Sequence, residues 1–314
     1  MRVLTYHRVL PAHAIGNEFV QPGMYVTDVT FERHVAYLRR EFRILSVGEM
    51  LDLWDTGRWD ARERYCVITF DDGWADTFRH AFPILRSHEV PATVFLPTER
   101  IGTTRWFWPD RLGYLLMRLG TASRDVQLAV WALLAQGVDS PEMPRGTRWA
   151  ERSDAIIERC KGLPSEAVEE MIEAAARRAG LAFPSERCLL SWGEVDDMGK
   201  QGISFGSHSA THRILTGLTQ EEVRFELESS LATLRTRHVN AVAAIAYPNG
   251  DTNAVVAEST RLAGYRAAFT TKAGAEGPLP GDRFALRRIG VHEDISATTS
   301  LFAFHVSRPR GARR

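Results

Sequence analysis

A short apolar run that ends in two adjacent carboxylates constrains the fold of this chain most. Tyr65-Cys66-Val67-Ile68 is typical of a buried strand, and Thr69-Phe70-Asp71-Asp72-Gly73 follows it directly. An ionised aspartate is rarely placed beside a core unless it is paired or binds a metal ion. Neighbouring residues in extended backbone point in opposite directions. Asp71 and Asp72 are therefore expected to have different roles, one toward a cation and the other toward a reacting group.

A second apolar run leads to a pair of histidines. Gly202-Ile203-Ser204-Phe205-Gly206 precedes Ser207, and His208 and His212 follow four residues apart. On one helical turn, side chains at this spacing face the same side. Two imidazoles and one carboxylate form a typical catalytic zinc set that leaves a position open for water. The sequence therefore predicts a divalent metal site, with Zn²⁺ as the expected ion, formed by Asp72, His208 and His212.

Strand and helix patterns alternate along most of the chain. The expected strands are residues 2–6, 43–45, 65–69, 92–96, 203–205, 242–246, 265–270 and 286–291. This alternation favours an α/β fold with a parallel sheet, open or closed. Such folds place their chemistry at the carboxyl ends of strands, where the pattern puts Asp71, Asp72, His208, Tyr247 and His292.

The alternation is interrupted between residues 101 and 190, where several helical patterns follow Trp106-Phe107-Trp108-Pro109. We interpret residues 101–190 as a helical insertion in a barrel-like domain formed by residues 1–100 and 191–305, with 306–314 as a basic, solvated tail. Insertions on the loop face of such folds often shape the substrate site. Trp106 is therefore a candidate substrate contact, although anchoring of the insertion to the barrel explains these aromatic residues equally well.

Composition excludes few classes of protein. The 314 residues are 44% hydrophobic and 25% charged with zero net charge, which is ordinary for a soluble globular protein and predicts no nucleic-acid partner. No apolar run is long enough to span a bilayer. The chain opens on a strand pattern without a visible signal peptide, and its three cysteines cannot all pair. A cytoplasmic location is therefore expected, and a secreted or periplasmic one if a leader has been removed.

Three motifs in this order carry a family resemblance. They are Thr69-Phe70-Asp71-Asp72-Gly73, His208-Ser209-Ala210-Thr211-His212 and Ala246-Tyr247-Pro248-Asn249-Gly250. The chain resembles the polysaccharide deacetylase family, the carbohydrate esterases with a NodB-homology domain, in the branch with a Tyr-Pro motif. The similarity extends from Leu4 to about Val291. It implies a distorted (β/α) barrel of about seven strands, which periodicity alone does not separate from a doubly wound sheet.

The resemblance also implies a reaction. The expected activity is metal-dependent removal of an N-acetyl group from an amino sugar of a polysaccharide, oligosaccharide or glycoconjugate, with release of acetate and a free amine. Asp71 would act as the general base beside the metal. A backbone N–H near Tyr247 would stabilise the oxyanion. His292 would protonate the leaving amine, although the family's usual Leu-x-x-His context is absent.

Further contacts are expected from the same comparison. Tyr247, Pro248 and His7 are candidate substrate-binding residues, and for His7 a structural hydrogen bond is the alternative. Many family members have an arginine before the Pro-containing motif that orients the base. Ala246 and Tyr247 stand there in this chain, so Arg287 or Arg288 would have to supply that contact.

Two other functions remain open. One is a metal-dependent hydrolase of the same fold that cleaves a linear C–N bond in a non-sugar amide, against which the aromatic residues of the insertion argue mildly. The other is an inactive carbohydrate-binding protein, against which the intact set of Asp71, Asp72, His208 and His212 argues. For both the deacetylase and the carbohydrate-binding protein, the expected partner is a carbohydrate. The oligomeric state is left open.

Overall fold

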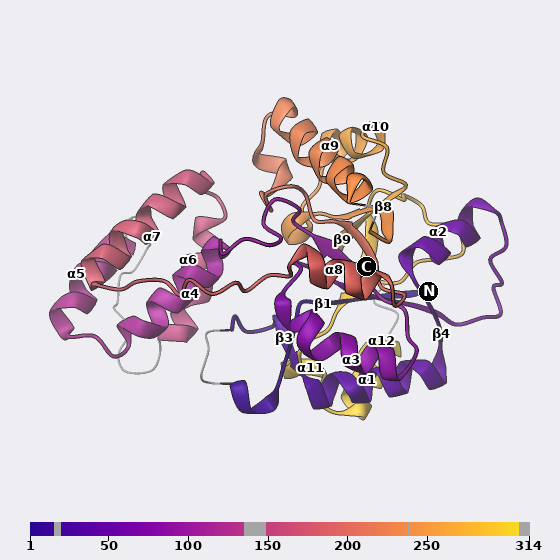
Figure 1. The fold of residues 1–314 in the computed structure, drawn as a ribbon, viewed down its shortest axis with the longest axis horizontal. Helices are drawn as coiled ribbons and strands as arrows, with labels where there is room; N and C mark the ends of the chain where they lie inside the picture. The colour runs from indigo at the N-terminus through magenta and orange to yellow at the C-terminus, as the bar shows by residue number, and fades with distance from the viewer. Residues whose placement is uncertain (16–19, 135–148, 238, 308–314) are drawn as a thin grey trace, which may run out of the picture. The chain divides into compact units, whose positions relative to one another are not determined.

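Parallel strands close into a barrel in the computed structural model, which describes residues 1–15, 20–134, 149–237 and 239–307 (Figure 1). Around the barrel the strands follow the order β1, β10, β9, β8, β7, β6, β5 and back to β1. Their bounds are β1 Arg2–Tyr6, β5 Tyr65–Phe70, β6 Thr93–Leu96, β7 Ser204–Ser207, β8 Ala241–Ala246, β9 Ala267–Ala273 and β10 Leu286–Gly290. The prediction of a distorted (β/α) barrel of about seven strands is confirmed.

The distortion is concentrated at β5. This strand pairs with β1 along almost its whole length, from Cys66 to Phe70. On its other side, β4 (Arg43–Leu45) pairs with residues 65–67 and β6 pairs only with Thr69 and Phe70. The strand that precedes the two aspartates is thus hydrogen-bonded to three neighbours, and every one of its residues is buried.

The barrel interior is filled by large apolar side chains that tolerate little change in volume. The rings of Phe95 and Phe269 lie 5.4 Å apart there, and they cluster with side chains of α2 (Val47–Asp55) such as Met50. Gly206 on β7 is required by this packing. A Cβ at that position would lie 2.5 Å from the Phe95 ring and 2.9 Å from the Ala244 carbonyl oxygen.

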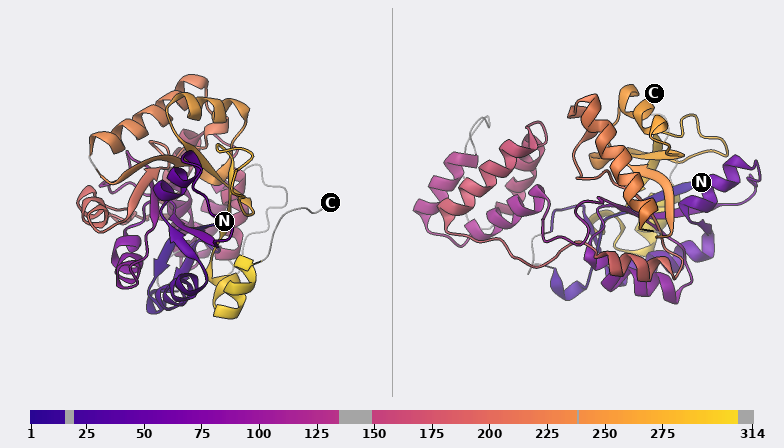
Figure 2. Two further views of the ribbon diagram at one scale, coloured as in Figure 1. Left: turned by 90° about the vertical axis from the view of Figure 1, so that its right-hand side faces the viewer. Right: turned by 45° about the horizontal axis from the view of Figure 1, so that its top comes forward.

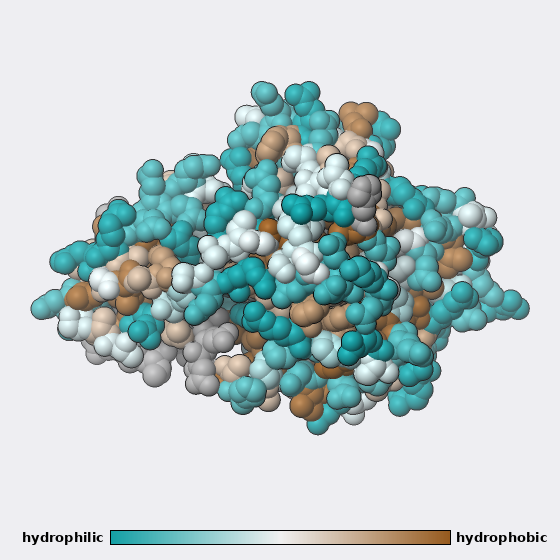
Figure 3. Space-filling model, viewed as in Figure 1, coloured by the Kyte–Doolittle hydropathy of each residue, from teal (hydrophilic) through white to brown (hydrophobic). Residues whose placement is uncertain are grey.

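Helices cover the outside of the barrel. Their bounds are α1 Asp28–Glu41, α3 Phe82–Ser87, α8 Trp192–Gly199, α9 Gln220–Thr236, α10 Ala254–Leu262, α11 Glu293–Ser296 and α12 Thr299–Ser307. α9 and α10 lie side by side (Figure 2) and pack on outward-facing Ile245 and Ala268. Two of these helices begin with a capping box, formed by Ser191 before α8 and by Thr219 before α9. Hydrophilic residues dominate the face shown in Figure 3, where apolar residues are scattered.

The chain divides into two compact units. One contains residues 1–13, 23–104 and 187–314, and the other contains residues 14–22 and 105–186. The second unit has its own apolar core between α4 (Trp108–Leu119), α5 (Arg124–Leu134), α6 (Trp149–Cys160) and α7 (Ser165–Ala179). That these helices shape the substrate side of the barrel stays a prediction. In the described part of the chain, no helix combines the length and the apolarity that crossing a membrane requires.

Both ends of the insertion are fastened to the loop after β5. The Gly102 N–H donates to the Leu190 carbonyl oxygen at 2.8 Å, and the Leu190 N–H donates to the Gly73 carbonyl oxygen at 2.8 Å. Trp74 forms an antiparallel bridge with Leu189. The chain therefore leaves the barrel and returns to it at neighbouring points, beside the two aspartates.

Three local features were not expected from the sequence patterns. The stretch from His7 to Thr27, where no strand was expected, contains the paired strands β2 (Arg8–Leu10) and β3 (Tyr25–Thr27). Strands of three residues are too short to show an alternating pattern. The helical segment between β5 and β6 includes a π-helical turn at Thr77–Ala81. α12 runs to Ser307, into the expected tail, and residues 308–314 of that tail lie outside the described residues, as do Pro141, Pro144 and His238.

A buried histidine joins α1 to the C-terminal helices. The Nε2 of His34 lies 2.7 Å from the Ser296 carbonyl oxygen, which can only accept, so Nδ1 accepts from the Tyr6 hydroxyl at 3.2 Å. The imidazole stacks on Phe302 with 3.7 Å between centroids. Burial lowers the pKa of His34 from 6.5 to about 4, and the nearby His305 adds to this effect while the hydrogen bond to Ser296 opposes it.

We expect the stability of the barrel unit to fall with pH below the pKa of an unfolded histidine. Between pH 6.5 and about 4 the unfolded chain binds a proton at His34 that the folded chain does not. The free energy of unfolding should then fall by about 1.4 kcal/mol per pH unit from this group. Urea unfolding should show the advantage of the natural protein over His34→Gln shrinking by about 2 kcal/mol between about pH 7 and pH 5. The exposed His13→Gln is the control, and an advantage that does not change with pH would contradict the assignment.

Candidate active site

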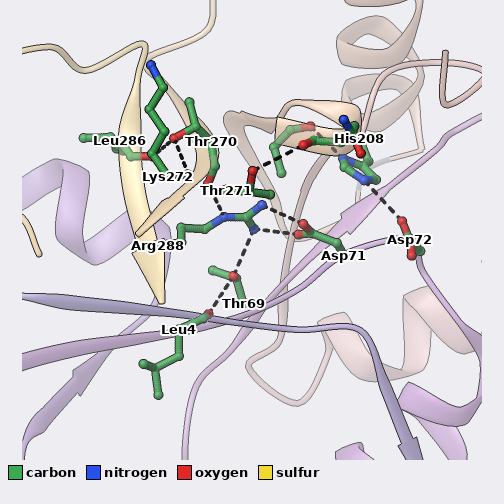
Figure 4. Close-up of polar contacts among 12 residues, drawn as sticks. Leu4, Thr69, Asp71, Asp72, His208, Thr270, Thr271, Lys272, Leu286 and Arg288 are labelled. Atoms are coloured by element: carbon green, nitrogen blue, oxygen red, sulfur yellow. Dashed lines mark hydrogen bonds and ion pairs between the residues drawn. The ribbon is translucent and has the colours of Figure 1, made fainter. Parts of the chain in front are cut away.

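Four parallel strands bring polar side chains to one rim of the barrel. Asp71 and Asp72 follow β5, His208 follows β7 and His7 follows β1, while Arg288 lies on β10. Because the strands are parallel, their carboxyl ends meet at this rim. Figure 4 shows Asp71 beside Arg288 and Asp72 beside His208. The two carboxylates thus have separate partners.

Asp71 and Asp72 point apart because the backbone turns between them. Asp72 has a φ of 71° and Gly73 a φ of 66°, and the Gly73 N–H donates to the Asp71 carbonyl oxygen at 2.9 Å. The expectation of divergent directions is met, but its reason, alternation in extended backbone, is wrong. A left-handed conformation is uncommon for a non-glycine residue and costs about 1 kcal/mol or more, so neighbouring contacts must hold it.

His208 and His212 converge on one oxygen of Asp72. Each Nε2 lies 3.2 Å from Asp72 Oδ1, and the two rings are 4.8 Å apart. The sequence argument placed the pair on a helical turn. In the structure they lie on a loop in which Ser209 (φ 62°) and His212 (φ 70°) are left-handed. An irregular turn, and not a helix, therefore brings the two histidines to the same side at a spacing of four residues.

A buried carboxylate on α9 holds this turn in place. Glu226 Oε2 accepts from the backbone N–H groups of Ala210 at 2.9 Å and Thr211 at 2.8 Å, and Oε1 accepts from the Thr211 hydroxyl. The Ser209 hydroxyl oxygen accepts from the His212 N–H at 3.0 Å. Hydrogen bonds to an ionised acceptor are stronger than neutral ones. Glu226 was not identified from the sequence, and it fixes the positions of the two imidazoles.

Asp72, His208 and His212 offer donors that fit a divalent cation. His208 Nδ1 lies 2.6 Å from the Ala246 carbonyl oxygen, so Nδ1 carries a proton and Nε2 is the ring atom directed at Asp72, where a cation would replace its proton. One donor atom from each residue lies within 4.8 Å of the other two. Burial would raise the pKa of Asp72, but the hydrogen bonds of His208 and His212 outweigh burial and hold it well below its usual range. An ionised carboxylate with two neutral imidazoles is the donor set of open zinc sites.

The second carboxylate is paired with an arginine from β10. Arg288 is fully buried, and its Nη1 and Nη2 each donate to one oxygen of Asp71 at 2.7 Å. Its Nε donates to the Thr270 carbonyl oxygen at 3.0 Å. Of the two arginines suggested from the sequence, Arg288 therefore makes the contact. Arg287 pairs with Glu276 instead.

This pairing keeps Asp71 charged. Burial by itself would raise the pKa of Asp71, but the charges of Arg288 and His208 and the hydrogen bonds of Arg288 outweigh burial. The pKa of Asp71 therefore lies below its usual value, and the group is a carboxylate at neutral pH. Because both of its oxygens are held by Arg288, it cannot rotate to join the metal ligands.

His7 lies near both carboxylates. β1 and β5 are in register with Tyr6 opposite Phe70, and the Asp71 N–H donates to the Tyr6 carbonyl oxygen at 3.0 Å. His7 therefore follows its strand at the same level as Asp71. Its charge contributes to lowering the pKa of Asp71 and of Asp72. Of the two histidines predicted beside the metal site, His7 is the one that interacts with its carboxylates.

His292 has other surroundings. Its Nδ1 lies 3.1 Å from Asp294 Oδ2. It also lines a pocket of about 190 Å³ together with Ile289, Ile295 and His305. Neither carboxylate of the candidate site is among the described residues that line this pocket. The structure thus adds no contact in favour of His292 as the acid.

Tyr247 faces away from the rim. It is fully buried, its hydroxyl donates to the Phe284 carbonyl oxygen at 3.1 Å, and its N–H donates to the Phe269 carbonyl oxygen at 3.0 Å. It shares the outward-facing cluster of Ile245, beneath α9 and α10. Pro248 is buried as well. Both the hydroxyl and the N–H of Tyr247 are thus bonded within the protein, so the structure adds no support for its predicted substrate contact, which stays a prediction, as does an oxyanion donor near Tyr247.

Trp106 belongs to the helical unit. Its Nε1 donates to the Glu186 carbonyl oxygen at 3.2 Å, and its ring packs edge-on against Tyr114. These contacts lie within the helical unit, so anchoring of the insertion to the barrel by Trp106 also stays a prediction. A contact of Trp106 with substrate stays a prediction.

Comparisons with known proteins agree on one family. A family model described as polysaccharide deacetylase matches residues 59–268. The poly-beta-1,6-N-acetyl-D-glucosamine N-deacetylase of Staphylococcus epidermidis is 30% identical over 112 residues, which are 33% of this chain and only 38% of that enzyme. This chain therefore spans well under half of that relative's length.

Solved structures show the same fold at low identity. The Streptococcus pyogenes deacetylase PplD in complex with acetate is 17% identical, with a TM-score of 0.61 over 98% of both chains. IcaB from Ammonifex degensii is also 17% identical, with a TM-score of 0.59 over 98% of this chain and 97% of IcaB. Likeness at this identity establishes the fold.

We expect Arg288→Met to destabilise the protein by about 3–5 kcal/mol at neutral pH, because it leaves Asp71 buried and unpaired. The double variant Arg288→Met/Asp71→Leu should recover most of this loss, since no buried charge remains. Urea unfolding measures both. In the single variant Asp71 gains a raised pKa, so its deficit should shrink as the pH falls and the carboxyl group takes a proton.

The exposed pair of Arg261 and Glu258 supplies the control for that series. Arg261→Met should change the stability little, as is usual for surface ion pairs. Equal instability of the single and double variants at Arg288 would show that the loss comes from packing and not from the unpaired charge.

Proposed function

The chain belongs to the polysaccharide deacetylase family, and we propose that it removes N-acetyl groups from an amino sugar of a polysaccharide, oligosaccharide or glycoconjugate in a metal-dependent reaction. The convergence of Asp72, His208 and His212 beside the separate carboxylate of Asp71 carries this proposal. Support for an amide of N-acetylglucosamine comes from the name of the Staphylococcus epidermidis relative, of which this chain matches a part.

Asp72, His208 and His212 would hold the divalent ion, and the donor set favours zinc. The bound ion would supply Lewis acidity, which makes water a better nucleophile at neutral pH and polarises the acyl carbonyl group. The Ala246 carbonyl oxygen holds His208, and Glu226 holds the loop between His208 and His212, so both imidazoles are arranged before a ligand arrives.

Asp71 is the proposed general base. It is ionised at neutral pH and lies next in sequence to a metal ligand, yet Arg288 keeps it out of the ligand set. An oxygen that accepts one hydrogen bond from a guanidinium still has a lone pair for the proton of the attacking water. Arg288 thus orients the base and stabilises its charged form before the reaction.

Asn249 is the proposed backbone donor to the oxyanion. The N–H of Tyr247 is used by Phe269, Pro248 has none, and the N–H of Gly250 donates to the Tyr247 carbonyl oxygen at 2.8 Å. Asn249 is exposed and has a φ of 59°, which turns its backbone out of the direction of β8. A donor of this kind contributes about 3 kcal/mol in other enzymes.

His7 is the proposed acid that protonates the leaving amine. It lies at the rim, is partly exposed and interacts electrostatically with both carboxylates. An imidazole is the commonest acid for such a step near neutral pH. His292, the acid expected from the resemblance, lines a different pocket with Ile289 and His305.

Acetate release tests the function directly. The purified protein loaded with zinc should release acetate from N-acetylglucosamine oligomers and much less from small linear amides. Release from linear amides alone would favour the rival hydrolase. The absence of release from either class, with zinc bound, would favour a binding protein.

Replacement of single groups should separate metal binding from turnover. Asp72→Ala and His212→Ala should lose both zinc and activity, because each removes one of three ligands. Asp71→Asn should keep zinc and lose activity by about 10²–10⁴-fold, because the amide cannot take a proton. Zinc content and acetate release measure the two effects, and an active Asp71→Asn would refute the assignment of the base.

The two histidines should differ in the same assay. His7→Gln should lower the rate by about 10²-fold or more and remove the fall in rate at high pH that reports loss of the acid's proton. His292→Gln should leave both the rate and the pH profile nearly unchanged. The reverse result would restore His292 as the acid.

A further inference from the structure

The two oxygens of Asp72 have different partners. Oδ1 lies 3.2 Å from the Nε2 of both His208 and His212. Oδ2 accepts a hydrogen bond from the indole Nε1 of Trp74 at 3.0 Å. Trp74 is only 4% exposed, so this hydrogen bond is shielded from water. One oxygen is therefore directed to the cation site and the other is held by protein.

Trp74 is in turn held by an ion pair that belongs to another part of the fold. The Arg8 guanidinium carbon lies 4.5 Å from the centroid of the Trp74 ring. Arg8 Nε donates to Asp76 Oδ2 at 2.7 Å, and Asp76 Oδ1 accepts from the Val9 N–H at 3.1 Å. The side chains of Arg8 and Asp76 are only 13% and 6% exposed. A buried pair of this kind is expensive to form, so it is weak evidence for stability alone.

We propose that Trp74 and Arg8 are positioning residues for the metal ligand Asp72. The indole N–H reserves Oδ2, so that Asp72 offers a single oxygen, Oδ1, at an orientation common to both imidazoles. Asp76 fixes the position of Arg8 through their ion pair, and Arg8 in turn fixes the orientation of the indole ring on which its guanidinium lies. A cation over the ring face also draws electron density from it, which strengthens the N–H as a donor.

This inference deepens the proposed function, because it rests on the metal site and not on the sugar substrate. Partners of this kind orient a ligating carboxylate and typically change metal affinity by 10–100-fold (an order-of-magnitude range) when they are removed. It also assigns a role to β2, the short strand that carries Arg8 and Val9. A purely structural role for the pair would tether β2 without affecting the affinity for zinc.

The first test is the affinity of Trp74→Phe for zinc. Phenylalanine keeps an aromatic ring beneath Arg8 and removes the N–H donor together with one ring of the indole. Competition with a chromophoric chelator should show zinc binding to the folded protein weakened by about 10–100-fold. Trp192→Phe is the matched control, because Trp192 also lies beneath an arginine, Arg237, at 4.7 Å. This control should bind zinc like the natural protein.

The second test asks whether Arg8 acts through the indole. Arg8→Met/Asp76→Leu removes both charges together, so no unpaired buried charge is left. Alone, this pair of substitutions should weaken zinc binding by a smaller factor, about threefold to tenfold. Added to Trp74→Phe, it should have no further effect, because the donor it holds is already gone.

The outcomes separate this inference from the proposed function. Unchanged zinc affinity in Trp74→Phe, or equal effects of the ion-pair change with and without the indole N–H, would overturn it. Zinc binding that follows the expected pattern in a protein that releases no acetate would sustain it and refute the deacetylase function. A natural protein that binds no zinc would overturn both.

Discussion

Two adjacent buried carboxylates repel each other, and the arrangement of the rim follows from how this repulsion is relieved. Each aspartate is given its own positive partner on an opposite side. Asp71 receives the guanidinium of Arg288 across the barrel interior, with both oxygens engaged. Asp72 is turned by its left-handed backbone toward His208 and His212, where a cation can neutralise it. The arginine thus does more than stabilise one acid, because by occupying Asp71 it leaves Asp72 as the carboxylate available to a cation.

The backbone strain of this arrangement is concentrated in the loops that carry the candidate site residues. Among the described residues, five that are not glycine have positive φ, and four of them, Asp72, Ser209, His212 and Asn249, lie in loops at the carboxyl ends of β5, β7 and β8. Strained backbone persists only where surrounding contacts determine it. Glu226 supplies such contacts under the histidine loop with three hydrogen bonds. These contacts hold the rim residues in defined positions, which suits groups that must be in place before a substrate arrives.

Local patterns were sufficient for a parallel sheet and for the choice of candidate ligands, and they failed where side-chain direction depends on the tertiary structure. The apolar runs and the spacing of strands and helices predicted the parallel sheet, the family resemblance predicted its closure into a barrel, and their chemistry singled out Asp72, His208 and His212 as candidate ligands. The helical argument for the histidines failed because a turn fixed by Glu226 replaces the helix. The sequence did not show that Tyr247 shares the outward-facing cluster of Ile245, because this requires knowing which face of the strand is inside. Arg288 lies two residues after inward-facing Leu286. Period-two analysis of β10 therefore places this arginine on the inner face, where a charged residue needs a partner.

The fastening of the insertion beside Gly73 has a consequence for how such a protein can diversify. Gly102 and Leu190 are hydrogen-bonded to each other, so the two ends of the intervening segment lie side by side. The segment contributes no strand to the barrel. Its length, sequence and helix content can therefore vary, or the segment can be exchanged for another module, without a change in the order or pairing of the strands. The anchor point adjoins Asp71 and Asp72, so such an exchange would leave the loop that carries these two carboxylates unaltered.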